Sequence, residues 1–208
     1  MMETITFDEI IKNFILLFVV IDPIGTIPVF IEYTKRHADV DSRKIAFKAC
    51  VFAFIILSFF LVAGQFLFES MSIPLAAFQV SGGIVLFLFA LSMIFGEGKP
   101  EREVSLAKSG SETALYPIAM PSLASPGAIV AVMLLTDNHR FSLLHQSITL
   151  GIVGLILLVT LIILALVRHI HRFIGDSGAS VLSRIMGLVL ASIAVNFVLE
   201  GIKTYFFI

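Results

Sequence analysis

Long apolar runs are the feature that most constrains the fold of this chain. A helix that crosses the hydrocarbon core of a bilayer needs about 20 mainly apolar residues. Because 58% of the residues are hydrophobic and only 14% are charged, little chain remains for a water-soluble domain. We predict a single transmembrane domain over residues 1–208 that crosses a lipid bilayer six times. The predicted spans are approximately 11–33, 45–68, 74–95, 114–136, 147–167 and 185–206.

The apolar runs predict helices and not strands. Apolar and polar residues do not alternate with a period of two, and each run is longer than the roughly ten residues of a membrane-barrel strand. A helix also satisfies its own backbone hydrogen bonds, which hydrocarbon cannot do. The predicted fold is therefore an all-α integral membrane domain of six transmembrane helices.

The basic residues predict the direction in which the chain crosses the membrane. Of the 14 Lys and Arg residues, all but Lys12, Arg140 and Lys203 fall in the loops after the first, third and fifth predicted spans or, for Lys48, in the first turn after such a loop. Loops on the cytoplasmic side carry an excess of Lys and Arg. We expect a multi-pass membrane protein with both termini outside the cytoplasm.

Two of the six windows are interrupted by prolines in matching positions. Pro23 and Pro28 lie near the middle of the first window, and Pro121 and Pro126 lie near the middle of the fourth, each pair five residues apart. Matched interruptions indicate an internal repeat, and halves of three spans each must be inverted across the membrane. We predict two inverted three-helix repeats with a broken first helix in each half. The halves are residues 1–105 and 106–208.

The two breaks carry side chains that suit the start of a helix. Asp or Ser before a proline can cap free backbone N–H groups, and a proline at the first helical position loses no hydrogen bond. Half-helices that start at Pro23 and Pro126 would bring two positive helix ends together near mid-membrane, which favours an anionic group such as a solute carboxylate. The predicted substrate-binding residues are Asp22, Pro23, Gly25, Thr26, Ser125, Pro126, Gly127 and Asn196.

Asp22 is the charged residue at the centre of this site. An ionised carboxylate in mid-membrane costs at least about 2.5–3.5 kcal/mol. It could stay ionised and bind an amine or a cation, it could carry a proton, or it could only cap the break, and the residues leave these roles open. Thr26 and Asn196 are neutral groups that can bind a ligand or another helix. Proton or cation coupling and a homo-oligomer also stay open.

Other classes of function lack the residues that they need. All five histidines fall in predicted loops, and no span pairs His with an acid, so no metal site is predicted. No Gly-x-Ser-x-Gly elbow, phosphate-binding loop or dinucleotide fingerprint is present, so we predict neither an enzyme nor a cofactor. No basic stripe with interleaved aromatic residues is present either, which argues against nucleic acid as a partner.

Three stretches of the chain resemble the MarC family of bacterial inner-membrane proteins, and the likeness extends over essentially the whole sequence. These stretches are residues 22–30, 117–129 and 184–190. The sequence has Asp22 where many members carry Asn, and Ser125 where Gly commonly precedes the second proline. The family is similar to the LysE transporter superfamily, and some archaeal relatives look like transporters of small neutral amino acids.

Together, the breaks and the resemblance predict a secondary transporter or exporter. Its expected solute is a small neutral amino acid or a similar carboxylate-bearing metabolite, held at mid-membrane between the half-helix ends. Two alternatives remain open. The first is a passive channel with the same architecture, and the second is a non-transporting scaffold or regulatory protein whose broken helices bind a partner protein.

Overall fold

The computed structural model describes residues 6–27, 30, 31, 34, 41–70, 74–95, 122–136 and 142–206. All regular secondary structure in these ranges is helical. The helices are α1 (Phe7–Ile21), α3 (Ser42–Ser70), α4 (Leu75–Phe95), α6 (Pro126–Leu134), α7 (Leu143–Ala165) and α8 (Val167–Phe206). The all-α prediction is therefore confirmed for the part of the chain that the structure describes.

Among the described residues, four helices are long and apolar enough to cross a membrane, namely α3, α4, α7 and α8. Their candidate spans are Ser42–Gly64, Ala76–Phe95, Leu143–Ala165 and Ser180–Phe206. These spans correspond to the second, third, fifth and sixth windows of the sequence. The first and fourth windows contain shorter helices, because α1 ends after 15 residues and α6 has only nine. Both short helices end or begin at the breaks that the prolines predict.

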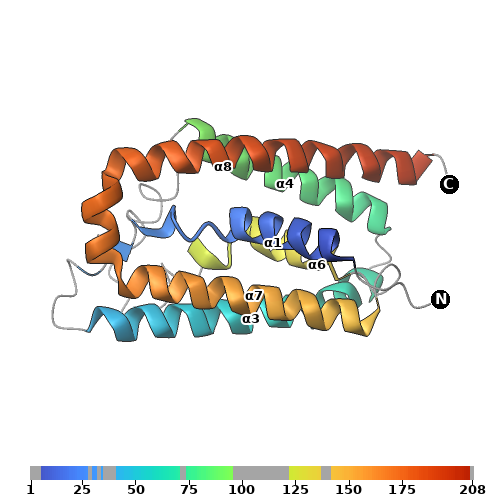
Figure 1. The fold of residues 1–208 in the computed structure, drawn as a ribbon. Coiled ribbons are helices and arrows are strands. Elements are labelled where there is room, and N and C mark those ends of the chain that lie inside the picture. Colours follow the sequence, from blue (N-terminus) through green and yellow to red (C-terminus); the bar gives the residue numbers. More distant parts are fainter. Residues whose placement is uncertain are drawn as a thin grey trace.

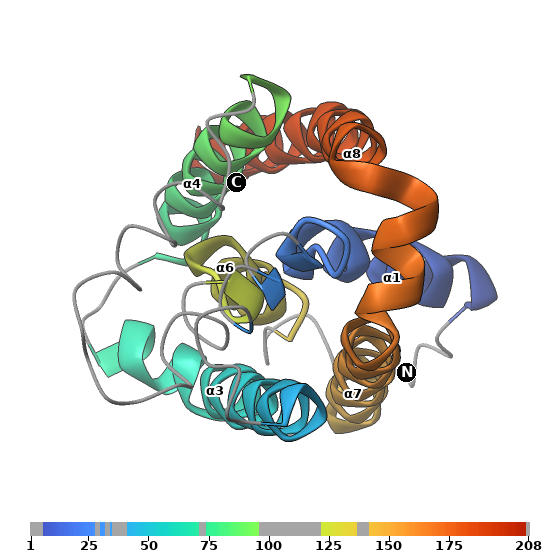
Figure 2. The same ribbon diagram turned by 90° about the vertical axis from the view of Figure 1, so that its left-hand side faces the viewer.

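The helices form two outer pairs with the short helices between them. Figure 1 and Figure 2 show α4 beside α8 at one edge of the bundle and α3 beside α7 at the opposite edge. Helix α1 packs against α6, α7 and α8, and α6 packs against α1, α3 and α4. The two interrupted segments therefore lie between the two pairs, and the buried part of α1 is its C-terminal end, from Leu16 to Ile21.

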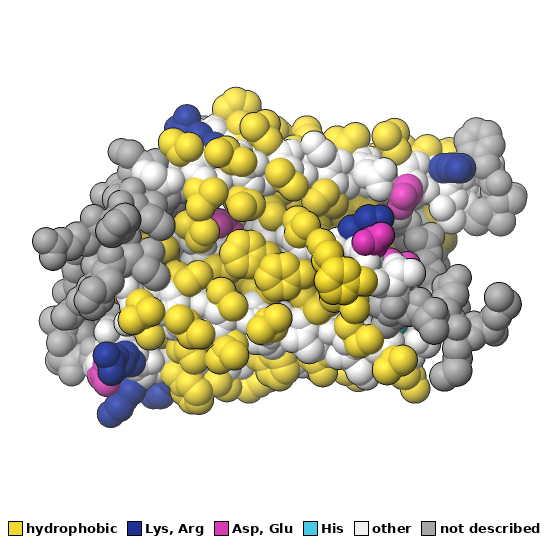
Figure 3. Space-filling view, viewed as in Figure 1, with side chains coloured by type: hydrophobic (Ala, Val, Ile, Leu, Met, Phe, Trp, Pro, Cys, Tyr) yellow, Lys and Arg dark blue, Asp and Glu magenta, His cyan; other side chains and the backbone are white. Residues whose placement is uncertain are grey.

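The surface of the bundle matches a bilayer. Apolar side chains cover most of the face seen in Figure 3, and most charged side chains visible there gather toward its two ends. Large apolar side chains such as Phe59, Leu88 and Leu155 are at least half exposed, at 56%, 60% and 50%. Helix α1 begins and α8 ends at the same end of the molecule (Figure 1), as an even number of crossings requires.

Helices α4 and α8 pack antiparallel at short range through glycines. A Cβ added at Gly83 would lie 2.9 Å from the carbonyl oxygen of Ala194, and one at Gly187 would lie 3.0 Å from that of Ala90. A Cβ added at Gly201 would lie 3.0 Å from the carbonyl oxygen of Ala76, near the start of α4. Small residues at such contacts let helix backbones approach and gain van der Waals contact, which is the main attraction between helices in lipid.

Gly187→Ala is expected to lower the free energy of unfolding by about 1–3 kcal/mol, because the added methyl group meets backbone that cannot move aside. The matched control is Gly151→Ala in α7, where nothing lies within 4 Å of the added Cβ. There the better helix propensity of alanine should raise stability by about 0.5–1 kcal/mol. Thermal unfolding of the two purified variants in one detergent checks this; equal midpoints would contradict the close α4–α8 contact.

The predicted loop positions of the histidines are wrong at the beginning of α7 and of α8. His145 lies in α7 and is only 7% exposed, with its Nε2 3.4 Å from Nδ2 of Asn13. The helix begins earlier than the apolar window because the Ser142 hydroxyl accepts a hydrogen bond from the His145 N–H. His169 and His171 belong to α8, which continues through the predicted loop because no proline follows Pro126 in the sequence. His37 and His139 lie outside the described residues.

Candidate functional site

Helix α1 ends at Asp22, which adopts a left-handed backbone conformation. Its φ is 51°, and its N–H donates to the carbonyl oxygen of Phe18 over 3.0 Å. Among the described non-glycine residues, only Asp22 has a positive φ. Asp and Asn adopt this conformation more readily than other side chains, and Pro23, which follows, cannot extend the helix. The break is therefore encoded by the two residues together.

The Asp22 carboxylate folds back over the turn that it begins. Its Oδ1 accepts a hydrogen bond of 2.9 Å from the N–H of Gly25. A Cβ added at Gly25 would overlap this carboxylate, with Cγ of Asp22 only 2.6 Å away. The glycine is thus required by the position of the carboxylate. Pro23 and Gly25 are both buried in this turn.

Thr26 connects the first break to the second. Its hydroxyl donates to the carbonyl oxygen of Asp22 over 3.0 Å and lies 3.2 Å from the hydroxyl of Ser122. Because the single hydroxyl hydrogen of Thr26 points to Asp22, Ser122 is the donor in the second contact. Both hydroxyl side chains have no exposed surface. Sequence reasoning missed Ser122, although it is a polar residue next to Pro121 in an apolar window.

Ser125 caps the N-terminus of α6 in the way that the sequence predicts. Its Oγ accepts a hydrogen bond of 3.1 Å from the N–H of Ala128, and its carbonyl oxygen accepts one of 3.0 Å from the N–H of Ile129. Pro126 occupies the first helical position and has no N–H to donate. Because the Ala128 N–H donates to Ser125 and Pro126 has none, the first turn of α6 keeps the N–H of Gly127 as its available donor.

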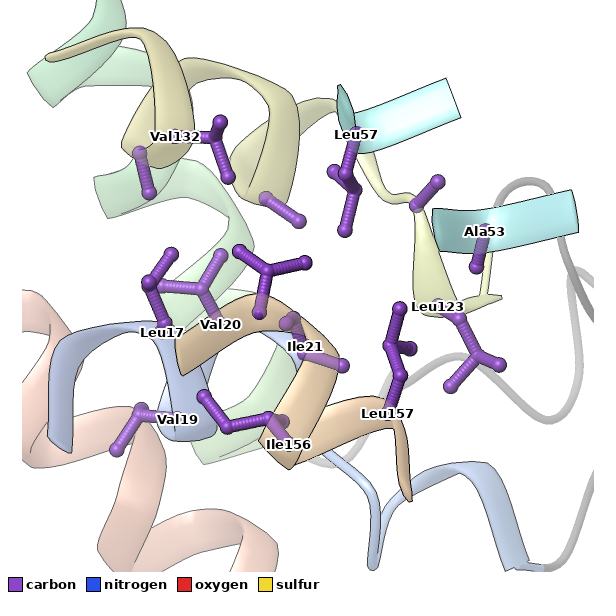
Figure 4. Packing of buried hydrophobic residues seen from close by; sticks show 14 of the residues in the cluster. Leu17, Val19, Val20, Ile21, Ala53, Leu57, Leu123, Val132, Ile156 and Leu157 are labelled. Carbon is purple, nitrogen blue, oxygen red and sulfur yellow. The ribbon is translucent and has the colours of Figure 1, made fainter. Parts of the chain in front are cut away.

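The end of α1 and the beginning of α6 lie against each other inside the apolar core. A Cβ added at Gly127 would lie 3.4 Å from Cγ1 of Val20. Asp22 is 5% exposed and Ser125 is 2% exposed. Figure 4 shows part of the apolar core, including Ile21, Leu57, Leu123 and Ile156; each of these four side chains has no exposed surface. The polar groups of the breaks are thus enclosed by apolar side chains, where their mutual hydrogen bonds are worth more than in water.

The structure brings together most, but not all, of the predicted site residues. The turn of Asp22, Pro23, Gly25 and Thr26 meets the Ser125 segment through Ser122. Asn196 lies exposed on α8, and the structure does not bring it to the breaks. The half-helix predicted to start at Pro23 does not start there, because residues 23–25 form a turn and the first helical residue is Thr26. Of this helix the structure describes only residues 26, 27, 30, 31 and 34.

Ser125→Ala is expected to lower the free energy of unfolding by about 1–2 kcal/mol, because it leaves the N–H of Ala128 without its partner in a buried place. Ser142→Ala is the matched control, since Ser142 also caps a helix but is exposed and accepts over 3.4 Å. Its effect should be smaller. Thermal unfolding of both variants tests this, and an equal or larger loss in Ser142→Ala would count against the buried cap.

Comparison with known proteins finds relatives along nearly the whole chain. The chain is 36% identical to a membrane protein of Aquifex aeolicus (strain VF5), over 93% of this chain and 92% of that protein. It is 32% identical to the membrane protein YvbG of Bacillus subtilis (strain 168), over 96% and 97%. It is 31% identical to the inner membrane protein YhgN of Escherichia coli (strain K12), over 95% and 98%. No solved structure matches the chain.

The sequence pattern described as "MarC family integral membrane protein" matches residues 7–206. This match includes both breaks and the six helices that the structure describes. With relatives above 30% identity over nearly its whole length, the chain belongs to the MarC family of integral membrane proteins.

Proposed function

We propose that this protein is a secondary transporter or exporter of small neutral amino acids, or of similar carboxylate-bearing metabolites. The observation that carries the proposal is the contact of 3.2 Å between Thr26 and Ser122, which joins the two breaks beside Asp22. Polar, irregular backbone inside a membrane protein is typical of transporter sites built from interrupted helices. Scaffolds and packing contacts have no need of a buried carboxylate at such a place.

The chemistry of the two breaks fits a zwitterion. The N-terminus of α6 carries a partial positive charge, and the N–H of Gly127 can donate to a solute carboxylate. Asp22 offers a negative group on the other side of the junction, and an ammonium group is its complement. A small solute is favoured because large side chains would have to displace the closely packed core around Ile21 and Leu123.

The contacts of the helices support an inverted repeat of residues 1–105 and 106–208. If α3 exchanges with α7, α4 with α8, and α1 with α6, the main helix contacts map onto one another. The glycine contacts follow the same rule, because Gly83 meets Ala194 and Gly187 meets Ala90. Gly83 and Gly187 are 104 residues apart, and so are Ala90 and Ala194. Inverted repeats of this kind are typical of alternating-access transporters.

The closed surroundings of the site favour a transporter over a passive channel. Thr26, Ser122 and the apolar side chains next to them have no exposed surface, so solute must enter by a rearrangement. We infer a location in the cell inner membrane, with both termini outside the cytoplasm, from the distribution of Lys and Arg and from the name of the Escherichia coli relative. Coupling to a proton or cation through Asp22 is part of the proposal.

A ligand-dependent stability screen tests the proposal. The purified protein is heated with a panel of glycine, alanine, serine, their decarboxylated amines and their deaminated acids. At a hundredfold excess over Kd, a true ligand should raise the unfolding midpoint by roughly 5–10 °C. The zwitterions should stabilise and the amines and acids should not. If no zwitterion shifts the midpoint while a protein partner does, a scaffold function replaces the proposed one.

A further inference from the structure

Among the predicted site residues, Asn196 is the one that the structure does not bring to the breaks, and it is a polar residue exposed in the middle of an apolar span. It lies in the candidate span Ser180–Phe206, and its side chain is exposed on the outer surface of the described bundle. It is four residues before Glu200, which places it about 6 Å further into the membrane at 1.5 Å per residue. A carboxamide at this place faces lipid in a single copy of the chain.

A carboxamide facing lipid needs a hydrogen-bond partner. Ser192, one turn earlier on the same face, satisfies its own hydroxyl by donating to the carbonyl oxygen of Leu188 over 3.1 Å. A side-chain amide has two N–H donors and a carbonyl acceptor. No described residue makes a hydrogen bond to the side-chain amide of Asn196. Hydrocarbon supplies none, and an unpaired amide is costly there. The partner must therefore come from another molecule.

We propose that the partner is a second copy of this chain, joined through the α8 face of Ser192, Asn196, Glu200 and Lys203. A carboxamide is self-complementary, because its N–H groups can donate to the carbonyl oxygen of an identical group. In a two-fold dimer each residue of such a patch meets the same patch on the other copy. Asn196 would pair with Asn196 of the second copy, and the small side chain of Ser192 would let the two helices approach.

The charges of the same face fit this partner. Glu200 and Lys203 are both exposed, and they lie three residues apart near the C-terminal end of α8. Two parallel copies can therefore pair the carboxylate of one with the ammonium group of the other, twice over. The small α8 residues that contact α4, including Gly187, Ala194 and Gly201, lie on a different face. Glu200 lies at the edge between the two faces, because its Oε2 accepts a hydrogen bond of 3.3 Å from Nε2 of Gln79 in α4. A carboxylate accepts more than one hydrogen bond, so the dimer can leave this contact in place. It would also leave the solute site free.

Cysteine cross-linking in native membranes tests the face. Cys50 is buried and is the single cysteine of the chain, so Cys50→Ala gives a clean background. Asn196→Cys should then form a covalent dimer with a mild oxidant. Leu155→Cys is the matched control, because Leu155 is 50% exposed on α7 but belongs to no polar stripe. A dimer band no stronger for Asn196→Cys than for Leu155→Cys would overturn the proposed face.

Energy transfer between labelled copies in liposomes tests the role of the amide itself. On dilution with lipid, Asn196→Leu should dissociate at roughly tenfold higher protein density than the unmodified chain, as expected for the loss of an interhelical amide contact. The thermal unfolding midpoint shows that the variant is folded. An unchanged dilution curve, or an unmodified chain that is monomeric at every density, would overturn the proposal. Neither result bears on solute transport, which is tested separately.

Discussion

Asp22→Ala is expected to lower the uptake of a labelled neutral amino acid into liposomes by about 30- to 100-fold, because it removes the charged partner of the ammonium group in a buried site. It also removes the acceptor for the N–H of Gly25, so part of the loss could come from a displaced turn. Uptake alone therefore does not separate the charge of Asp22 from its structural role, and a second variant is required.

Asp22→Asn separates these roles. Asn tolerates the φ of 51° at this position, and its side-chain oxygen can still accept from the N–H of Gly25. The turn should therefore persist, with an unfolding midpoint close to that of the unmodified protein. If the carboxylate binds the amine or carries a proton, Asp22→Asn loses uptake as Asp22→Ala does. Full uptake by Asp22→Asn would contradict a role for the charge and leave only the cap.

The second large effect is expected for Gly25→Ala. The new methyl group would overlap the Asp22 carboxylate, so either the turn or the carboxylate must move. We expect the free energy of unfolding to fall by about 1–3 kcal/mol, as for other overpacked sites. The measurement is thermal or denaturant unfolding in a fixed detergent.

A double variant tells whether the overlap with the carboxylate is the cause. Asp22→Gly removes the side chain and still permits the left-handed conformation. If the account is correct, adding Gly25→Ala to Asp22→Gly should cost much less than adding it to the unmodified chain, with a coupling energy of about 0.5–3 kcal/mol. Strictly additive losses would mean that the alanine acts through some other contact.

The sequence predicts both breaks and four of the six spans well, because these features depend on short stretches of chain. The first and fourth windows contain α1 and α6, which are shorter than a complete span. Apolar windows of sufficient length have few alternatives to a membrane helix. Pro23 and Pro126 mark the two breaks to within a residue, because a proline lacks the N–H that a continuing helix needs. The cap of Ser125 is equally local, since it involves a residue only three positions away.

Features that depend on helix rotation and on contacts between distant segments could not be predicted in this way. The sequence gives the depth of Asn196 in the membrane but not the face of α8 on which it lies, so its inclusion in the solute site was a prediction from depth alone. The contact between Thr26 and Ser122 joins residues 96 positions apart. The burial of His145 depends on how α7 packs beside α1, where Asn13 lies.

The structure shows which donor is left at the second break. The sequence predicts the cap of Ser125 and a positive end of α6 that favours an anionic group, but not which N–H group stays available. Because Ser125 caps Ala128 and Pro126 has no N–H, the first turn keeps the Gly127 N–H as its donor. A solute carboxylate would therefore depend on this N–H and on the helix dipole, because the Thr26 hydroxyl donates to Asp22 and the Ser122 hydroxyl donates to Thr26.

Counterflow in liposomes tests the central claim most directly. Liposomes that contain the purified protein are loaded with unlabelled alanine, glycine or serine and diluted into a trace of the labelled amino acid. A secondary transporter with a saturable site predicts transient accumulation of label above the outside concentration, and its loss in Asp22→Ala. Label that only equilibrates would indicate a passive channel, and label that does not enter beyond protein-free liposomes would contradict transport of these solutes.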